Sequence, residues 1–378
     1  MLNRRLFLAG TAGAIISGCS AGPGLRHAGF AHPVPLAPLK FSADRLMRIT
    51  VCSRPFRPAG PRLEAEAFDG KLVVHNYGQG GSGWSLSWGC AEEATALALT
   101  DGPREVAVIG AGVMGLTTAL RLVETGVRVT IYAKEFPMET RSSRATGVWS
   151  PSSRIGLADA VDRSFPDRWE RWARFSLEAH QRYLGAIGDP VEFVPAYNLF
   201  DESDRPHASG KHDFLKLDSR IDDAVPGFSA VPPDTVPFPV ARAESGLYMT
   251  FNVASYAQRL TQDFLAHGGR MLRRELPDRA AALALPEPVI VNCAGYGAKS
   301  LWQDDDLVPV RGQINWLAPQ PEARYSVFYN NVVGLSRRDG VIVQYVGPDD
   351  DWGYGDDSEI ADRQEMLDAL ATLRPLFS

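Results

Sequence analysis

The run "REVAVIGAGVMGLTTALRLVETGVRVTIYAKE" at residues 104–135 decides the fold of this chain. Apolar residues 106–109 predict a short buried strand, and a G-x-G-x-x-G turn follows it at once. The next residues predict a helix that reaches about residue 124, and residues 127–133 predict a second strand. A strand, a glycine turn and a helix inside one βαβ unit indicate a dinucleotide-binding fold.

Each glycine of this turn has its own expected task. Gly110 permits the turn, Gly112 lets the backbone approach a pyrophosphate, and Gly115 lets the helix pack closely on the strand. The start of the helix offers unpaired N–H groups to the phosphates. The predicted cofactor-binding residues of the turn are Gly110, Ala111, Gly112, Val113, Met114 and Gly115.

The end of the second predicted strand departs from the usual pattern. An acidic residue normally holds the adenosine ribose there. This chain has Lys134 at that place, followed by Glu135. Either Glu135 holds the ribose or the site lacks the acid, and a lysine also suits the 2′-phosphate of NADP.

Four later stretches carry a family resemblance. They are "FPMETRSSRATGVWSPSS" (136–153), "EFVPAYNLF" (192–200), "VIVNCAGYGAKSLWQDDDLVPVRGQINWLAP" (289–319) and "VFYNNVVGLSRRDGVIVQYVG" (327–347). In this order they resemble the D-amino-acid oxidase family of flavoenzymes. The resemblance runs from about residue 104 to 378. It implies an α/β fold with an FAD-binding Rossmann-like domain and a mixed-sheet substrate domain, and it favours FAD over NADP.

Two segments of that family stand out of order. In the family an "R-P-x-R-P…R-L-E" segment and an "HNYGHGGxG…WGC" loop follow the last helix. Here their counterparts come first, as "RPFRPAGPRLE" (54–64) and "HNYGQGGSGWSLSWGC" (75–90). The order resembles a circular permutation joined at residues 100–103, which chain ends that lie close together would allow. It predicts that Arg54 and Gly81 lie near the turn at 110–115.

The resemblance also assigns the substrate contacts. Arg54 is expected to hold the substrate carboxylate in a forked, charge-assisted pair, with Arg57 as the alternative. Tyr329 is expected to add a hydroxyl, and the Gly81 carbonyl is expected near the substrate amine. Val333 stands where the family has a second tyrosine, which puts the substrate preference in doubt. Tyr345 and Tyr248 are candidates to replace that hydroxyl.

Further flavin contacts follow from the same resemblance. The glycine loop is expected beside the flavin ring and ribityl chain, through Gly80, Gly81, Ser82, Gly83, Trp84 and Ser85. A hydroxyl-rich segment is expected at the phosphates and ribityl chain, through Thr140, Arg141 and Ser142. A second loop is expected under the flavin, through Gly147, Val148 and Trp149.

The remaining polar motifs favour structural roles. His75 begins the glycine loop, and hydride transfer needs no protein base, so we expect a structural hydrogen bond there. The acidic runs at 304–306 and 349–351 predict solvated loops, and no metal site is expected. Cys90 and Cys293 are expected to be buried, without a structural disulfide.

The start of the chain predicts export. Arg4 and Arg5 precede an apolar run that ends in "IISGC", so residues 1–19 resemble a twin-arginine signal with a bacterial lipobox. This implies cleavage before Cys19, a lipid anchor there, and a periplasmic or membrane-anchored lipoprotein; the alternative is a plain secretory signal. Residues 20–45, rich in Pro, Gly and Ala, predict a tether.

The whole chain is long enough for two domains. It has 378 residues, 45% of them apolar, and its net charge of −6 without a basic block indicates no nucleic-acid partner. The FAD domain is predicted at 57–155 and 244–300, and the substrate domain at 46–56, 156–243 and 301–378.

The expected activity is oxidative deamination of a D-amino acid by hydride transfer to FAD. The products would be a 2-oxo acid and ammonia, with hydrogen peroxide if oxygen is the electron acceptor. The alternatives are a dehydrogenase or oxidase of glycine, an N-alkyl or an acidic amino acid that uses another acceptor, and a flavin-binding lipoprotein without turnover. The sequence indicates no oligomeric state.

Overall fold

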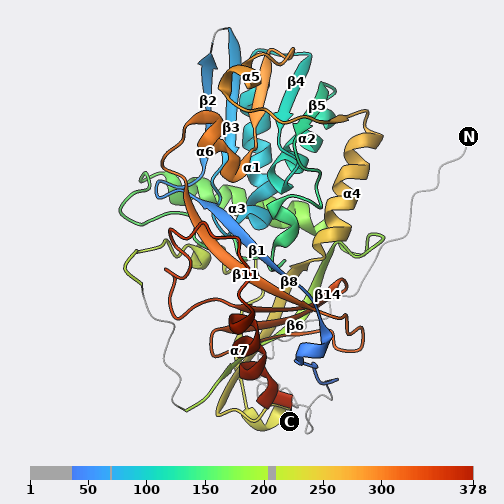
Figure 1. Ribbon diagram of the computed structural model, residues 1–378, viewed down its shortest axis with the longest axis vertical. Helices are drawn as coiled ribbons and strands as arrows, with labels where there is room; N and C mark the ends of the chain where they lie inside the picture. Colours follow the sequence, from blue (N-terminus) through green and yellow to red (C-terminus); the bar gives the residue numbers. More distant parts are fainter. Residues whose placement is uncertain (1–35, 69, 203–209, 378) are drawn as a thin grey trace, which may run out of the picture.

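The computed structural model describes residues 36–68, 70–202 and 210–377. The chain forms a mixed α/β fold with two sheets, one in each half of the elongated molecule (Figure 1). This confirms the predicted fold class. The predicted signal at 1–19 lies outside the described residues. Within them, no helix is long and apolar enough to cross a membrane.

The six-stranded sheet contains the predicted βαβ unit. Its order is β2-β3-β10-β4-β5-β9, and all neighbours are parallel except the β2–β3 pair. The strands are β2 (Arg62–Phe68), β3 (Lys71–Tyr77), β4 (Glu105–Ile109), β5 (Arg128–Ala133), β9 (Arg270–Arg273) and β10 (Val289–Asn292).

The eight-stranded sheet has the order β1-β11-β14-β13-β12-β6-β8-β7. Only β12 and β6 pair in parallel. The strands are β1 (Leu46–Phe56), β6 (Val191–Phe200), β7 (Ser229–Val231), β8 (Arg242–Phe251), β11 (Val308–Leu317), β12 (Ser326–Tyr329), β13 (Val332–Arg337) and β14 (Gly340–Tyr345).

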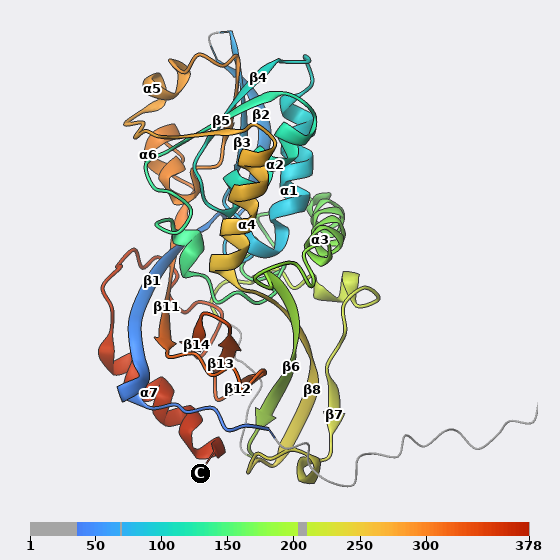
Figure 2. The ribbon, with the colours of Figure 1, turned by 90° about the vertical axis from the view of Figure 1, so that its right-hand side faces the viewer.

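The helices cover both faces of the six-stranded sheet. Figure 2 shows α1, α2 and α4 on one side of it, with α5 and α6 on the other. The helix α7 lies against the eight-stranded sheet. The helices are α1 (Gly83–Ala98), α2 (Val113–Glu124), α3 (Phe165–Gln181), α4 (Val253–Ala266), α5 (Arg279–Leu283), α6 (Ala298–Trp302) and α7 (Arg363–Leu373).

The alternation of side chains along β4 explains why this sheet is buried on both faces. Val106 and Val108 pack into the core under α1 and α2, whereas Ala107 and Ile109 pack into the core with α5 and α6. A continuous apolar strand is typical of a parallel sheet covered on both sides. The short strand and the α2 helix were therefore predictable from sequence.

Two predicted boundaries need correction. A boundary at residue 244 would cut β8, which pairs with β6 along its whole length in the eight-stranded sheet. Residues 36–45 are not a tether, because Leu39 and Phe41 are buried against the core around α7. Hydrogen bonds fix this segment, since Gln320 Oε1 accepts from Lys40 N at 2.8 Å and Tyr325 Oη donates to Ala37 O at 2.8 Å. The Pro and Gly content predicted an extended segment, but Leu39 and Phe41 bury their side chains and hold it in place.

Candidate active site

A cavity of about 550 Å³ lies where the ends of β4 and β5 meet the eight-stranded sheet. This volume is within the usual range for ligand sites. Its wall includes residues of both sheets, from the turn after β4 to β1, β8, β11, β13 and β14. Ligands of open α/β sheets bind at the carboxyl ends of the strands, which is the position of this cavity.

The turn after β4 has the close contacts that its glycines predicted. Gly110 adopts φ +101°, and a Cβ there would lie 2.6 Å from Cys293 O. A Cβ on Gly115 would lie 2.0 Å from Gly110 O, so this position packs the helix on the turn and does not line the cavity. Gly110, Ala111, Gly112, Val113 and Met114 all line it.

Both residues at the end of β5 reach the same cavity. Lys134 and Glu135 line it, so the geometry leaves both as candidates for the ribose. Arg274 and Glu275, which follow β9, lie on the same wall. Neither was selected from the sequence, because only the pairing of β9 with β5 brings them there.

The glycine loop at 78–83 forms another part of the wall, between segments that are distant in the sequence. Gly80 N donates to Pro55 O at 2.8 Å, and Gly81 N donates to Ser153 O at 3.0 Å. Gly80 has φ +54°, and a Cβ there would lie only 1.9 Å from Arg154 O. The loop ends earlier than predicted, since α1 already begins at Gly83.

Four of the six residues predicted in this loop line the cavity: Gly80, Gly81, Gly83 and Trp84. Ser82 instead donates from Oγ to Ser153 O at 3.1 Å, and Ser85 Oγ accepts from Ser150 N at 2.8 Å. These two hydroxyls fasten the loop to residues 150–153. Both serines were expected beside the flavin, but they do not line the cavity and instead support the loop from behind.

The segment 140–148 forms the third part of the wall. Thr140, Arg141, Ser142, Gly147 and Val148 line the cavity. Ser142 joins both glycine turns, because its Oγ accepts from Val113 N at 3.0 Å and its carbonyl accepts from Trp84 Nε1 at 2.9 Å. Trp149 was expected under the flavin but lies buried against His180, with a centroid distance of 5.8 Å.

The two arginines of "RPFRP" point to different surroundings. Arg54 lines the cavity, with Nη1 donating to Arg311 O at 3.1 Å and the guanidinium against Gly312. Among the described residues, no carboxylate forms an ion pair with it. Burial lowers the pKa of Arg54, with a small opposing effect from Cys52. Such an unpaired cation is a ready carboxylate site.

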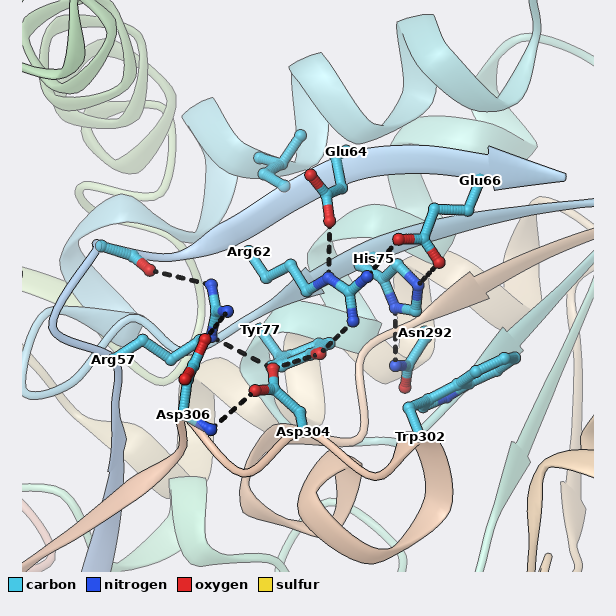
Figure 3. Close-up of polar contacts among 12 residues, drawn as sticks. Arg57, Arg62, Glu64, Glu66, His75, Tyr77, Asn292, Trp302, Asp304 and Asp306 are labelled. Carbon is cyan, nitrogen blue, oxygen red and sulfur yellow. Dashed lines mark hydrogen bonds and ion pairs between the residues drawn. The ribbon is translucent and has the colours of Figure 1, made fainter. Parts of the chain in front are cut away.

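Arg57 is committed to a separate ion-pair network (Figure 3). Its Nε lies 3.1 Å from Asp304 Oδ2 and its Nη2 lies 3.1 Å from Asp306 Oδ2. Tyr77 Oη also donates to Asp304 Oδ2 at 2.7 Å. Asp304 is buried, so the prediction of a solvated acidic loop was wrong at this residue. Arg57 is therefore occupied, and Arg54 is the better placed of the two.

His75 belongs to the same network and lies outside the cavity (Figure 3). Its Nδ1 accepts from Asn292 Nδ2 at 3.1 Å, and its Nε2 lies 3.4 Å from Glu66 Oε2. Burial, followed by the charge of Arg62, lowers the pKa of His75 to about 3. The imidazole is neutral at pH 7 and has the structural role expected from the sequence.

Tyr329 does not reach the cavity, so its predicted role was wrong. Its Oη donates to Asp201 Oδ2 at 2.6 Å, and its ring packs into the core with α7. Opposite residues in an antiparallel pair share one face of the sheet. Tyr329 pairs with buried Val332, whereas the neighbouring Phe328–Val333 pair faces the other way and Val333 lines the cavity.

The two substitutes for the missing hydroxyl do reach the cavity. Tyr248 on β8 and Tyr345 at the end of β14 both line it. Burial raises the pKa of Tyr248 to about 12 and also raises that of Tyr345, so both hydroxyls are protonated donors at neutral pH. The sequence named them as candidates, and both line the cavity although β13, β12 and β6 separate their strands in the sheet.

Other cavity residues had no signal in the sequence. Arg154 and Trp352 lie on the wall, the first after Trp149 and the second in the loop after β14. Arg154 Nε donates to Asp350 O at 2.9 Å, which links these two loops. In that loop Asp350 and Asp351 are paired with Lys216 and His212. The acidic run at 349–351 thus anchors a loop that borders the cavity.

No metal cluster and no disulfide are found in the described ranges. They contain no group of three or more His, Cys, Asp or Glu that would hold a metal ion. Cys90 and Cys293 are buried free thiols, and Cys52 is a partly exposed one on the cavity wall.

A model of the FAD dependent oxidoreductase family (DAO) matches residues 105–377, so the chain belongs to this family. It is 29% identical to a D-amino-acid oxidase of Streptomyces coelicolor over 287 residues, covering 72% of this chain and 78% of the relative. A D-amino-acid oxidase of Rubrobacter xylanophilus is 27% identical, over 61% of this chain and 64% of its own. Glycine oxidase from Geobacillus kaustophilus has a similar fold, with a TM-score of 0.50, 15% identity, and 72% and 78% of the two chains covered.

The residues at the turn fit an FAD pyrophosphate. The first turns of α1 and α2 both reach the cavity, so two helix N-termini face it. A side chain at Gly112 would fill the space between them, because its Cβ would lie 2.9 Å from Ser142 Oγ. Bound FAD would supply the hydride acceptor of an amino-acid oxidation. The wall of this cavity supplies backbone N–H groups at the helix starts and the guanidinium of Arg54, which has no carboxylate partner among the described residues.

Proposed function

We propose that this protein binds FAD and oxidises a D-amino acid at its Cα–N bond. One observation carries the proposal: Arg54 lines the same cavity as the turn at 110–114 and has no carboxylate partner among the described residues. An arginine at this place would hold the substrate carboxylate. The family membership supports an FAD-dependent oxidoreductase acting on an amino acid.

The chain's own residues would orient the substrate. Arg54 would fix the carboxylate, and Tyr248 and Tyr345, which line the same cavity, are the candidates to donate a hydrogen bond to it. The glycine loop at 80–81 would let the amine approach the backbone without a Cβ in the way. Loss of the hydride from Cα and of a proton from the amine gives an imino acid. Water then converts it to a 2-oxo acid and ammonia.

The proposal is tested by anaerobic bleaching of the flavin with a panel of D-amino acids and glycine. We expect bleaching by at least one D-amino acid, followed by reoxidation and peroxide release when oxygen is admitted. Arg54→Ala should lower kcat/KM by about 100-fold or more, since it removes two charge-assisted hydrogen bonds. A flavin that no member of the panel bleaches would reject the activity. Unchanged turnover in Arg54→Ala would remove Arg54 from the site.

We also propose that the chain order is circularly permuted relative to the family. The family match begins at residue 105, yet β1, β2, β3 and α1 precede it and belong to the two sheets and to the cavity wall. The segment that leads into β1 lies beside the last helical turn, since the rings of Phe41 and Phe377 are 5.5 Å apart. The other junction is short, from α1 to β4 through Gly102 at φ +60°.

A gene rearranged to restore the family order tests the permutation. Residues 36–100 would follow residue 378 through a short linker. We expect soluble protein with one FAD per chain and the same order of preference among substrates. An insoluble or flavin-free product, with the parent protein loaded under the same conditions, would contradict the proposal.

For the location we propose export with a lipid anchor at Cys19, supported by the paired arginines and the "IISGC" step. Mass spectrometry of the protein from a bacterial host, together with membrane fractionation, tests this. A chain that keeps residues 1–18 and stays in the cytosolic fraction would contradict it.

A further inference from the structure

The cavity wall is strongly cationic. Seven Lys or Arg residues line it, against the two carboxylates of Glu135 and Glu275. The cationic residues are Arg54, Lys134, Arg141, Arg144, Arg154, Arg274 and Arg311. Some already have acidic partners: Glu359 pairs with Arg141 and Arg144, and Glu365 pairs with Arg311. Within the part of the chain that the structure describes, no ion pair is formed by the other four: Arg54, Lys134, Arg154 and Arg274.

Arg154 lies on the same side of the cavity as Arg54. The loop at 79–81 separates their backbones, because Gly80 N bonds to Pro55 O while a Cβ on Gly80 would touch Arg154 O. Arg154 also lines an adjoining cavity of about 240 Å³. Its guanidinium therefore stands at the border between the main cavity and a side pocket.

Within the described residues, the aspartates near Arg154 form no ion pair with it. Asp350 pairs with Lys216 and Asp351 pairs with His212, and Arg154 Nε donates to the Asp350 carbonyl at 2.9 Å. Burial, and after it the positive charge of Arg54, lowers the pKa of Arg154 to about 10, against an opposing effect of the three aspartates. Two guanidinium groups without an acidic partner among the described residues share one cavity, and an anion between them would relieve their repulsion.

The backbone of Arg154 is held in an unfavourable conformation. Its φ is +50°, in the left-handed region that glycine or asparagine usually occupies. Strained backbone at non-glycine residues clusters at ligand sites. An arginine at this unfavourable backbone position therefore indicates that its side chain has a function.

We propose that Arg154 recognises a second carboxylate, so that the substrate is a dicarboxylic amino acid. This inference rests on the proposed function, with Arg54 holding the α-carboxylate. Arg154 holds the distal carboxylate at the mouth of the side pocket, and the hydride leaves from the Cα between them. Arg154 is a specificity residue and takes no part in the hydride transfer.

Substrate pairs of equal shape test this. D-glutamate is compared with D-glutamine and D-aspartate with D-asparagine, by kcat/KM for flavin reduction. For whichever acid the wild-type protein oxidises with the higher kcat/KM, we expect that kcat/KM to exceed the value for its amide by more than 10-fold. Arg154→Met should lower that ratio by about 10- to 100-fold. The kcat/KM for the amide should stay within about 3-fold of its wild-type value. Arg171→Met, which removes an exposed cation of α3 that lines neither the main cavity nor the side pocket, should leave the ratio unchanged.

A preference for the amides in the wild type, or an equal loss for acid and amide in Arg154→Met, would overturn the proposal. A second measurement serves if that variant fails to fold. Glutarate and pentanoate are titrated into the wild-type holoprotein and followed by the flavin absorbance. Glutarate should bind at least 10-fold more tightly, and equal affinities would overturn the proposal. This titration needs no turnover, so it separates failure of the Arg154 assignment from failure of the proposed oxidation.

Discussion

The cavity has two glycine-rich turns, and they owe their shapes to different parts of the chain. The turn at 110–115 packs mainly against itself and β10, since Gly115 contacts Gly110 O and Gly110 contacts Cys293 O. The loop at 78–83 packs against residues 55 and 153–154, which belong to other parts of the fold. Each turn leads into a helix whose first turn reaches the cavity.

This difference separates two tasks. The first turn joins the strand and the helix of one βαβ unit and is placed to hold a cofactor. The second becomes a site only when β1 pairs with β11 and the loop after Trp149 folds over it. Damage to the first turn should therefore abolish cofactor binding, and damage to the second at Gly80 or Gly81 should affect the substrate step more than cofactor binding.

The largest effect is expected at Gly115. A Val there would place its Cβ about 2 Å from Gly110 O, where the backbone cannot yield without moving α2. We expect Gly115→Val to give insoluble or FAD-free protein, measured as flavin absorbance per chain. A soluble Gly115→Val variant with one FAD per chain would contradict this prediction, because it would show that the turn accommodates a side chain at residue 115.

A smaller, selective effect is expected at Gly81. In Gly81→Ala the new Cβ would lie 2.5 Å from Ser153 Oγ, which can move, and 2.9 Å from the backbone oxygen of Ser153, which requires a small shift of the loop. The loop should shift slightly, keeping FAD but lowering kcat/KM by about 10- to 100-fold. Gly81→Ala combined with Ser153→Gly should recover part of this loss. If Gly81→Ala loses its flavin as Gly115→Val does, the two turns do not have separate tasks.

Two buried histidines beside the loop at 78–83 should make the stability of the protein depend on pH. His75 lies on β3 just before it, and His180 Nε2 bonds to Trp84 O at the start of α1 at 3.0 Å. Burial lowers the pKa of both histidines to about 3 in the folded state, while an unfolded histidine titrates near 6.5. Unfolding therefore takes up protons as the pH falls from about 6.5 to about 3, and the folded state loses stability there.

Between pH 7 and pH 5 each histidine should lower the free energy of unfolding by roughly 2 kcal/mol. Denaturant unfolding at the two pH values measures this loss. His75→Gln and His180→Gln should each show a shallower pH dependence than the parent. A parent whose stability is the same at pH 5 and pH 7 would contradict the neutral, buried state of these histidines.

The smallest effect is expected at Tyr329. Its hydroxyl bonds to Asp201 outside the cavity, so Tyr329→Phe should leave kcat/KM within about 2-fold and cost about 1 kcal/mol of stability. Tyr248→Phe and Tyr345→Phe are the matched comparison on the cavity wall. A large loss of activity in Tyr329→Phe with no loss in the other two would restore the role that the sequence suggested.

The same contrast explains what the sequence allowed us to predict. The β4–α2–β5 unit and the roles of Gly110 and Gly115 were predictable because the strand, the turn and the helix follow one another within about 30 residues, although Gly110 also contacts the distant Cys293. The face on which Tyr329 lies depends on the register of β12 and β13, and a single-residue change of register reverses it. Arg154 had no motif, because only the folding of its loop onto Gly80 brings it to the cavity.

The central claim is that Arg54, from a segment that precedes the family match, holds a carboxylate beside the cofactor. Its most direct test is a titration of FAD-loaded protein with an unreactive monocarboxylate such as propionate, followed by the flavin absorbance. Arg57→Ala is the matched control, because Arg57 is bound to Asp304 and Asp306. The account predicts saturable binding in the wild type and in Arg57→Ala, and a Kd raised at least 100-fold in Arg54→Ala with full FAD content. An unchanged Kd in Arg54→Ala, or loss of propionate binding in Arg57→Ala alone, would contradict the assignment of Arg54.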